Sequence, residues 1–375
     1  MFNRDDVFEG HGVIVVPNGI TDINDRCFKD SSVTKITLPN SLTRIGKSAF
    51  SKCKLKQIMI PKNVAEIGEK CFGHCTELTS VILPSSIENI VWGTFLECNI
   101  KFIEIPEGVT SIGISSFKDC SSLTRVKLPS TLTQINTCAF FKCGITSIRI
   151  PESVTKIGSE CFSFCSRLSS INIPKNVKVL KDNILKDTAI TSIDISDKIL
   201  TGSIFSHCTR LTHFKLPSNM TEYYKNMFTC LHGLERFKIP DGITKLGECC
   251  FLGCTNLTYI KLPPNITELP FACFSDCKIR HITVPEGVTR IRTDCFRDCS
   301  NLVSITLPSS LTRIGKRCFE STMLHLLVIP KNVNYIGYDF CDNCKNLSLI
   351  KLSQELFNGL VYHPLCINGI KLEIY

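Results

Sequence analysis

The sequence predicts one elongated solenoid of about 15 stacked coils, each 22 or 23 residues long, although 375 residues would ordinarily form two or three globular domains. Three observations predict it. A proline recurs every 22 or 23 residues, a phenylalanine follows most of these prolines by eleven residues, and a cysteine follows that position by three residues in 11 of 15 repeats. A single coil of this size cannot bury both sides of its apolar face, so the coils must stack.

The residues before each repeat proline predict a short strand with one buried face. The segment 78–84 carries apolar residues at alternate positions and ends at a proline, which cannot continue a hydrogen-bonded ladder. Further apolar residues three and six positions after the proline, such as Val64 and Ile67, predict a tight turn or a second short strand. Glycine often follows, as at Gly46, and predicts a positive φ there. The repeat prolines are Pro17, Pro39, Pro61, Pro84, Pro106, Pro129, Pro151, Pro174, Pro217, Pro240, Pro263, Pro285, Pro308 and Pro330, with Ser196 and Ser353 in the two remaining phases.

The stretch that holds the phenylalanine and the cysteine predicts about one helical turn, so each coil closes through a short helical or extended return. Cys71 and Cys75 would then lie on one inner face. All such cysteines occupy periodic inward positions, which predicts free, buried thiols and no metal site among the 23 cysteines. So many free thiols favour a reducing compartment.

The pattern weakens at the ends of the chain and in its middle. We expect an N-terminal cap at residues 1–10, the repeat solenoid at 11–352 and a C-terminal cap at 353–375, because an open end would expose apolar core. The repeats are irregular at about 174–240, through either neutral drift or a surface shaped for a partner.

The segment LPNSLTRIGKSAFSKC, residues 38–53, resembles the repeat of the BspA-like, or Treponema-type, leucine-rich-repeat family. The resemblance covers residues 11 to about 352. It implies a leucine-rich-repeat solenoid that forms a right-handed curved array and binds other molecules, in proteins that are often surface-associated and sometimes adhesive. It implies no activity.

The net charge of +9 gathers on the outward positions of the predicted first strands. These positions hold 12 basic and three acidic residues, whereas the rest of the chain holds 31 of each sign. The strand face is therefore predicted to bind an anionic partner, the alternative being a solvated face with an incidental bias. The denser patch contains His213, Lys215, Arg236, Lys238, Tyr259, Lys261, Arg280 and His281, and a smaller patch contains Arg125, Lys127 and Arg149.

Three lysines of the denser patch, Lys215, Lys238 and Lys261, are predicted to form a row of ammonium groups about 4.8 Å apart. Because like charges in such a row repel, an anionic ligand would stabilise it. Arginine can bind carboxylate or phosphate bidentately, and Tyr259 offers a flat apolar contact.

These residues predict a non-catalytic interaction scaffold that presents a basic strand face to an acidic protein or an anionic glycan. The alternative is a surface-associated adhesin that binds host or matrix molecules. No catalytic motif, phosphate-binding loop or cofactor motif is found, so we expect no enzyme and no cofactor. Nucleic acid fits less well, because the face carries few aromatic residues.

The location of the protein is predicted from what the sequence lacks. No apolar run approaches the roughly 20 residues that span a bilayer, and the first residues lack the apolar core of a signal peptide. We therefore expect a cytoplasmic protein, with export to the cell surface by a non-classical route as the alternative. Peripheral membrane association and self-assembly stay open.

Overall fold

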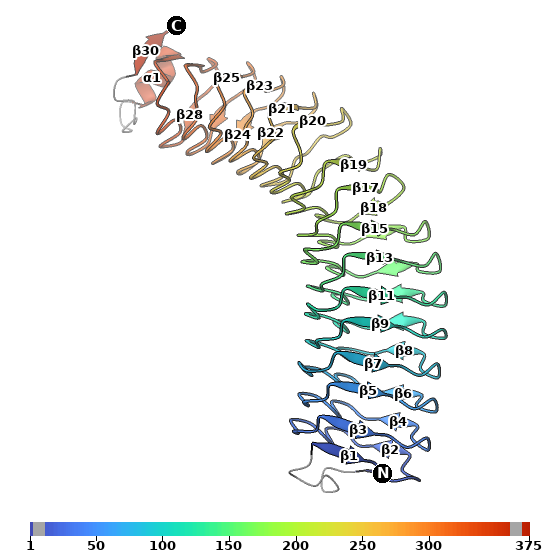
Figure 1. The fold of residues 1–375 in the computed structure, drawn as a ribbon. Coiled ribbons are helices and arrows are strands. Elements are labelled where there is room, and N and C mark those ends of the chain that lie inside the picture. The colour runs from blue at the N-terminus through green and yellow to red at the C-terminus, as the bar shows by residue number, and fades with distance from the viewer. Residues whose placement is uncertain (3–11, 361–369) are drawn as a thin grey trace. The chain divides into compact units, whose positions relative to one another are not determined.

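The computed structural model describes residues 1–2, 12–360 and 370–375, which form stacked coils of short parallel strands (Figure 1). The chain divides into two compact units, Met1–Ile204 and Phe205–Tyr375, called here the N-terminal and C-terminal units. The predicted solenoid is confirmed. Residues 3–10 of the predicted N-terminal cap and residues 361–369 of the predicted C-terminal cap lie outside the described residues.

The first strands of neighbouring coils stack in parallel, in a register that advances by one repeat. Ile14 pairs with Ile36, and Ile58 pairs with Val81. The central residue of each strand faces the core and its two neighbours face outward. In the N-terminal unit the first strands are β1 (Val13–Val15), β3 (Lys35–Thr37), β5 (Gln57–Met59), β7 (Ser80–Ile82), β9 (Phe102–Glu104), β11 (Arg125–Lys127), β13 (Ser147–Arg149), β15 (Ser170–Asn172) and β17 (Ser192–Asp194). In the C-terminal unit they are β19 (His213–Lys215), β20 (Arg236–Lys238), β21 (Tyr259–Lys261), β23 (His281–Thr283), β25 (Ser304–Thr306), β27 (Leu326–Val328) and β29 (Leu349–Leu352).

Second strands of two residues form parallel ladders of their own in each unit, apart from those of the first strands. The sequence predicted either a tight turn or a second short strand here, and the second strand is found. Ile45 pairs with Ile67 and both are buried, so the apolar residue six positions after the proline faces the core. The second strands are β2 (Asp22–Ile23), β4 (Arg44–Ile45), β6 (Glu66–Ile67), β8 (Asn89–Ile90), β10 (Ser111–Ile112), β12 (Gln134–Ile135), β14 (Lys156–Ile157), β16 (Val179–Leu180), β18 (Ile199–Leu200), β22 (Glu268–Leu269), β24 (Arg290–Ile291), β26 (Arg313–Ile314) and β28 (Tyr335–Ile336).

The predicted helical turn in the return is wrong, because the return is a series of tight turns. The N–H of Cys27 bonds to the carbonyl of Asn24 three residues back, whereas the N–H of Phe28 bonds to Ala49 in the next coil. Residues nine and thirteen positions after the proline have positive φ, for example Arg26 at 58°. Each left-handed residue reverses the chain and turns alternate N–H groups toward the neighbouring coil.

The prediction of positive φ at the repeat glycine is also wrong. None of the glycines seven positions after the repeat proline has a positive φ. Glycine is needed there for space, because a Cβ atom on Gly158 would lie 2.2 Å from the backbone nitrogen of Thr137 in the preceding coil. Close approach of two backbones, rather than a left-handed conformation, selects this residue.

The repeat phenylalanines form a stacked column inside each unit. In the N-terminal unit the ring centroids from Phe28 to Phe162 lie 5.0–5.8 Å apart, and Phe2 stacks on the first of them at 5.8 Å. In the C-terminal unit the column runs from Phe228 to Phe319 with spacings of 5.0–5.9 Å. Each ring therefore contacts the coil before it and the coil after it.

Nearly all of the described cysteines are buried, as predicted, and several donate hydrogen bonds to backbone carbonyls, which was not predicted. The structure describes 22 cysteines, of which all but Cys138 and Cys230 are buried. The Sγ atom of Cys75 donates to the carbonyl of Phe50 in the preceding coil at 2.9 Å, and other repeat cysteines repeat this contact. The thiol column thus links adjacent coils beside the phenylalanine column.

The difference between 22-residue and 23-residue coils lies at the bend after the cysteine. In a 23-residue coil the N–H of Leu78 bonds to the carbonyl of Cys75 at 3.0 Å, which holds the extra residue in a tight turn. In a 22-residue coil the apolar residue follows one position sooner, as Leu55 follows Cys53. The rest of the coil keeps its spacing.

The first coils of the C-terminal unit depart from the regular pattern, within the irregular range predicted from the sequence. Glu222 and Lys245 form an isolated bridge where other coils have second strands. Phe214 and Phe237 replace aliphatic residues on the first strands, and their rings lie 5.7 Å apart in an aromatic cluster with the buried Tyr223. Aromatic side chains fill the space that regular strand stacking fills elsewhere.

The chain ends in a helix and a strand that belong to the C-terminal unit. Helix α1 (Gln354–Leu360) follows β29, and strand β30 (Lys371–Ile374) pairs with β29 in parallel. The N–H of Leu356 bonds to the hydroxyl of Ser353 at 3.2 Å, a typical N-cap contact.

Candidate anion-binding face

The eight residues of the denser predicted patch are all exposed, and seven of them lie on the first strands of the C-terminal unit. Arg280 directly precedes β23 and is exposed as well. We call these eight residues the C-terminal basic face. They are His213, Lys215, Arg236, Lys238, Tyr259, Lys261, Arg280 and His281.

The centre of this face is the pairing of β20 with β21. Arg236 lies opposite Tyr259, and its guanidinium carbon lies 4.5 Å from the ring centroid. Lys238 lies opposite Lys261, so two ammonium groups occupy neighbouring positions and repel each other. Asp241 lies 3.9 Å from the Lys238 ammonium, but both groups are largely exposed and the ion pair is weak.

The predicted row of three lysines is correct for only two of them. Among the described strands, β20 pairs with β21 and has no ladder pairing with β19, which carries Lys215. Phe214 and Phe237 lie on these two strands, with their ring centroids 5.7 Å apart. Lys238 and Lys261 therefore form the closely paired part of the face.

A hollow of about 700 Å³ lies beside this pair, over β21, β23 and β25. Tyr259, Lys261 and His281 line it, together with strand hydroxyl groups. It also includes Asp241, whose carboxylate lies 3.9 Å from the Lys238 ammonium. The Nδ1 atom of His281 lies 2.7 Å from the hydroxyl oxygen of Ser304, which fixes the orientation of the imidazole. The hollow thus combines a cation, an aromatic ring and hydrogen-bonding groups, which suits an anionic ligand.

In the smaller predicted patch, in the N-terminal unit, one of the three cations is compensated by a carboxylate. The Lys127 ammonium lies 2.5 Å from the Glu104 carboxylate, and this hydrogen bond raises the pKa of Lys127. The Arg125 guanidinium stacks on Phe102 at 5.4 Å. Arg149 lies on β13 opposite Asn172, so no second cation is paired with it. The C-terminal basic face is the better candidate.

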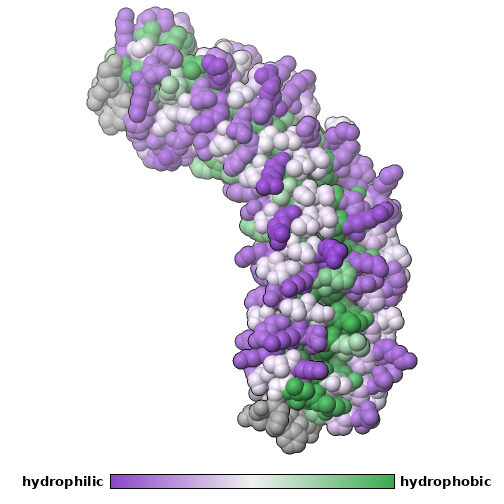
Figure 2. All heavy atoms as spheres, viewed as in Figure 1, coloured by the Kyte–Doolittle hydropathy of each residue, from purple (hydrophilic) through white to green (hydrophobic). Residues whose placement is uncertain are grey.

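Sequence reasoning missed an apolar strip on the strand face of the N-terminal unit. Val15, Met59 and Ile82 project outward with more than half of their surface exposed, and Met59 lies opposite Ile82. Apolar side chains gather over these N-terminal coils in Figure 2. Apolar residues at the outward positions of these N-terminal coils are the sequence signal that could have revealed the strip.

Metal ligation, membrane spanning and thiol reactivity can each be assessed in the described part of the chain. Within residues 1–2, 12–360 and 370–375, no group of three or more His, Cys, Asp or Glu side chains could hold a metal ion. No helix in these ranges has the length and apolar character needed to cross a bilayer. Burial raises the pKa of Cys53 to about 11 and that of Cys120 to about 12, so these thiols are poor nucleophiles at neutral pH.

Comparison with known proteins places the chain in a family. The model of the BspA type leucine rich repeat region matches residues 10–109, 92–203, 198–303 and 267–358, with six copies. No curated protein matches the chain significantly. A leucine rich cell surface protein from Faecalibacterium prausnitzii is 28% identical, with 93% of this chain and 90% of that chain covered and a TM-score of 0.56.

A leucine-rich repeat protein from Bacteroides ovatus is also similar. It is 26% identical, with 96% of this chain and 76% of that chain covered and a TM-score of 0.50. The handedness and curvature implied by the resemblance stay predictions. The matched repeats, the parallel coils and these two structures agree, and the chain belongs to the BspA-type leucine-rich-repeat family.

Proposed function

We propose that this protein is a non-catalytic binding protein whose C-terminal basic face contacts an acidic protein. The observation that carries the proposal is the unfavourable pairing of Lys238 with Lys261, the second of which lines a hollow. Such a pair costs stability in the free protein and is relieved when an anion binds. An anionic glycan is the alternative ligand of the same face.

Each part of the face has a distinct use toward an acidic segment. Lys261 supplies a point charge and has no ion pair with any described residue. The guanidinium of Arg236 is held in place by its stack on Tyr259, so less side-chain entropy is lost when it binds a carboxylate. His281 and the strand hydroxyls offer hydrogen bonds to a backbone.

A surface-associated adhesin is the second candidate function, and one comparison favours it. The similar protein from Faecalibacterium prausnitzii is named a cell surface protein. The cytoplasmic location expected from the sequence gains no such support. Surface display would be tested by labelling intact cells with a membrane-impermeant amine reagent: labelled protein supports the adhesin, and labelling only after lysis supports the intracellular scaffold.

The proposed face is tested by capture of partners from native lysate and from cell-surface extract. Wild type is compared with a variant that carries Lys215→Glu, Lys238→Glu and Lys261→Glu, all at exposed positions. We expect the wild type to retain an acidic partner that the folded variant loses. Equal capture by both proteins would refute the role of this face.

A matched pair of single substitutions then sharpens the test. Lys261 and Lys127 occupy the same position, two residues before the repeat proline, but Lys127 is already bonded to Glu104. Lys261→Gln should lower the affinity for the captured partner about tenfold. Lys127→Gln should change that affinity less than about twofold. Equal effects would mean that net charge, and not this face, drives the binding.

A further inference from the structure

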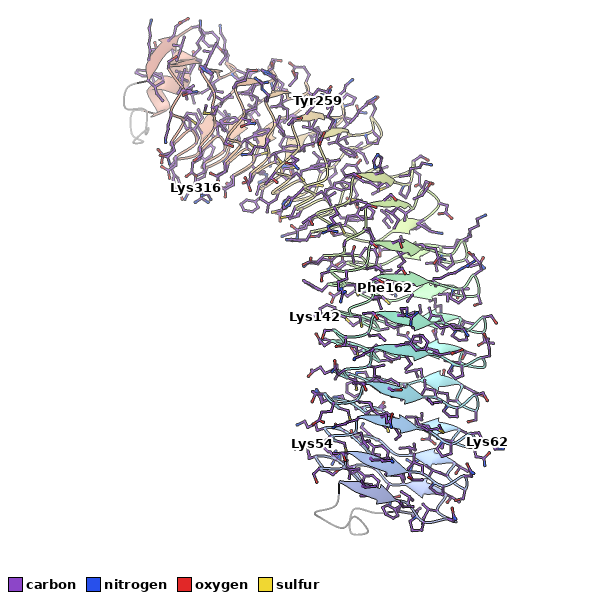
Figure 3. The ribbon with its side chains drawn as sticks, in the orientation of Figure 1. Lys54, Lys62, Lys142, Phe162, Tyr259 and Lys316 are labelled. Carbon is purple, nitrogen blue, oxygen red and sulfur yellow. The ribbon has the colours of Figure 1, made fainter. Side chains whose placement is uncertain are left out.

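A second basic hollow lies on the second-strand side of the C-terminal unit. It has a volume of about 320 Å³ and is lined by β24, β26 and the beginning of β28. Figure 3 shows Lys316, which lines this hollow, on a different side of the unit from Tyr259 of the C-terminal basic face. The two hollows are therefore separate sites.

The described lining of this hollow contains four cationic side chains and no carboxylate. The cationic residues are Arg290, Arg292, Arg313 and Lys316. Arg292 is neutralised by Glu268, whose carboxylate oxygen lies 3.1 Å from its Nε atom and 2.9 Å from a terminal nitrogen. The other three cations have no carboxylate within ion-pair distance among the described residues. This hollow, called here the arginine hollow, thus carries about three uncompensated positive charges.

Two of these cations are placed against each other by the fold. Arg290 and Arg313 are direct partners in the ladder of β24 and β26. Parallel strands lie about 4.8 Å apart, so two guanidinium groups leave the sheet side by side, and like charges in such positions are destabilising.

Two other cations at the same repeat position are paired with carboxylates of neighbouring coils. Arg44 lies 3.4 Å from Glu66 in the next coil and 3.4 Å from Asp25. Lys245 lies 3.3 Å from Glu222. Glu268 is the ladder partner of Arg290, but its carboxylate bonds to Arg292 instead. Arg290 and Arg313 therefore have no such contact with a described residue.

Tyrosine rings hold two of the cations in place. The Arg313 guanidinium carbon lies 4.3 Å from the centroid of Tyr335, and the Lys316 ammonium lies 3.7 Å from that of Tyr338 and donates a hydrogen bond to its hydroxyl. These contacts reduce the entropy lost on binding. Both rings remain about half exposed, so apolar aromatic surface borders the arginine hollow.

We propose that the arginine hollow binds a sulfated glycan, with a sulfate ester between Arg290 and Arg313. Two guanidinium forks match the terminal oxygens of a tetrahedral oxyanion, and Lys316 adds a point charge. The exposed tyrosine surface beside it suits the C–H face of a sugar ring. A volume of about 320 Å³ is at the small end of ligand sites, which favours one sulfated sugar unit over a folded protein segment.

The test measures the affinity of the full chain for a fluorescent, fully sulfated heparin-derived tetrasaccharide by anisotropy. The double variant Arg290→Gln/Arg313→Gln should bind it at least about tenfold more weakly than wild type, with a shallower salt dependence. The control is Arg44→Gln, which removes an arginine from the same repeat position where carboxylates already compensate it. This control should retain the wild-type affinity.

Folding of the double variant is checked by its thermal midpoint. The substitutions relieve a like-charge contact but also remove the stack of Arg313 on Tyr335, so the midpoint should stay close to that of wild type. The single variants Arg290→Gln and Arg313→Gln then report binding without the combined change.

Four results would overturn the proposal. These are unmeasurable binding of the tetrasaccharide to wild type, equal binding of its desulfated form, equal affinity for inorganic sulfate alone, or tighter binding of a phosphoserine peptide. A variant of the other face, Lys238→Gln/Lys261→Gln, separates the two sites. If it loses the tetrasaccharide while the arginine variant retains it, the glycan belongs to the C-terminal basic face and not to the arginine hollow.

Discussion

Substitution of one ring in the phenylalanine column tests how strongly neighbouring coils stabilise each other. Phe117 is fully buried, and its ring lies 5.3 Å from that of Phe95 and 5.3 Å from that of Phe140. Phe117→Leu removes both ring contacts and keeps most of the volume, a replacement that the chain itself makes at Leu185. At about 0.5–1.5 kcal/mol for each aromatic pair, the loss is about 1–3 kcal/mol.

A larger truncation at the same position sets the upper limit of the destabilisation. Phe117→Ala removes the ring contacts and leaves a cavity between two coils, which typically costs about 3–5 kcal/mol. Both costs are measured as shifts of the urea unfolding midpoint of the full chain, with amide hydrogen exchange reporting protection in the N-terminal unit. A negligible cost of Phe117→Leu beside a large cost of Phe117→Ala would show that volume alone matters and that ring stacking contributes nothing.

A double-mutant cycle isolates the contact between rings. The pair Phe95→Leu and Phe117→Leu should couple by about 0.5–1.5 kcal/mol, because these rings stack directly. The pair Phe95→Leu and Phe140→Leu spans two coils and should be additive within about 0.5 kcal/mol. Equal coupling in the two cycles would refute stabilisation by nearest neighbours.

Two further predictions follow from the thiol column and the repeat glycine. Burial raises the pKa of Cys120 from 9.0 to about 12, so the unfolded chain loses this proton first. The urea midpoint should therefore fall as the pH rises from 9 toward 12, less steeply in Cys120→Ala, and an unchanged slope would contradict this. Gly158→Ala should cost about 1–3 kcal/mol through backbone contact, whereas Gly242→Ala, with its nearest atom 4.0 Å away, should leave the thermal midpoint unchanged; similar midpoints would refute the spacing argument.

Periodic residues predicted the strands because burial alone decides their positions. Apolar residues stand at the positions of Val64 and Ile67 in most coils, and both of these residues are buried as their spacing requires. The return was predicted wrongly because the N–H of Cys27 bonds three residues back, as in a helical turn, while the N–H of Phe28 bonds to the next coil. Only the second contact distinguishes the two conformations, and it joins residues a full repeat apart.

The candidate binding faces could likewise be predicted from the sequence only in part. Counting charges on outward positions found Lys238 and Lys261, but it treated Lys127 as equivalent although Glu104 lies one coil earlier at the same position. The arginine hollow was missed because the second-strand positions were not compared between coils. Repulsion between Arg290 and Arg313 depends on the register of their strands. The repeat length determines this register, but a count of charges does not include it.

Each 23-residue coil accommodates its extra residue at the bend after the cysteine, and this limits where the chain can change length during evolution. A one-residue insertion after the cysteine only adds a tight turn at the surface, as the hydrogen bond from Leu78 to Cys75 shows. The same insertion between the proline and the phenylalanine would rotate every following ring and thiol out of its column. Length variation should therefore accumulate at one bend per coil, and duplication or loss of whole coils should preserve the stack on both sides.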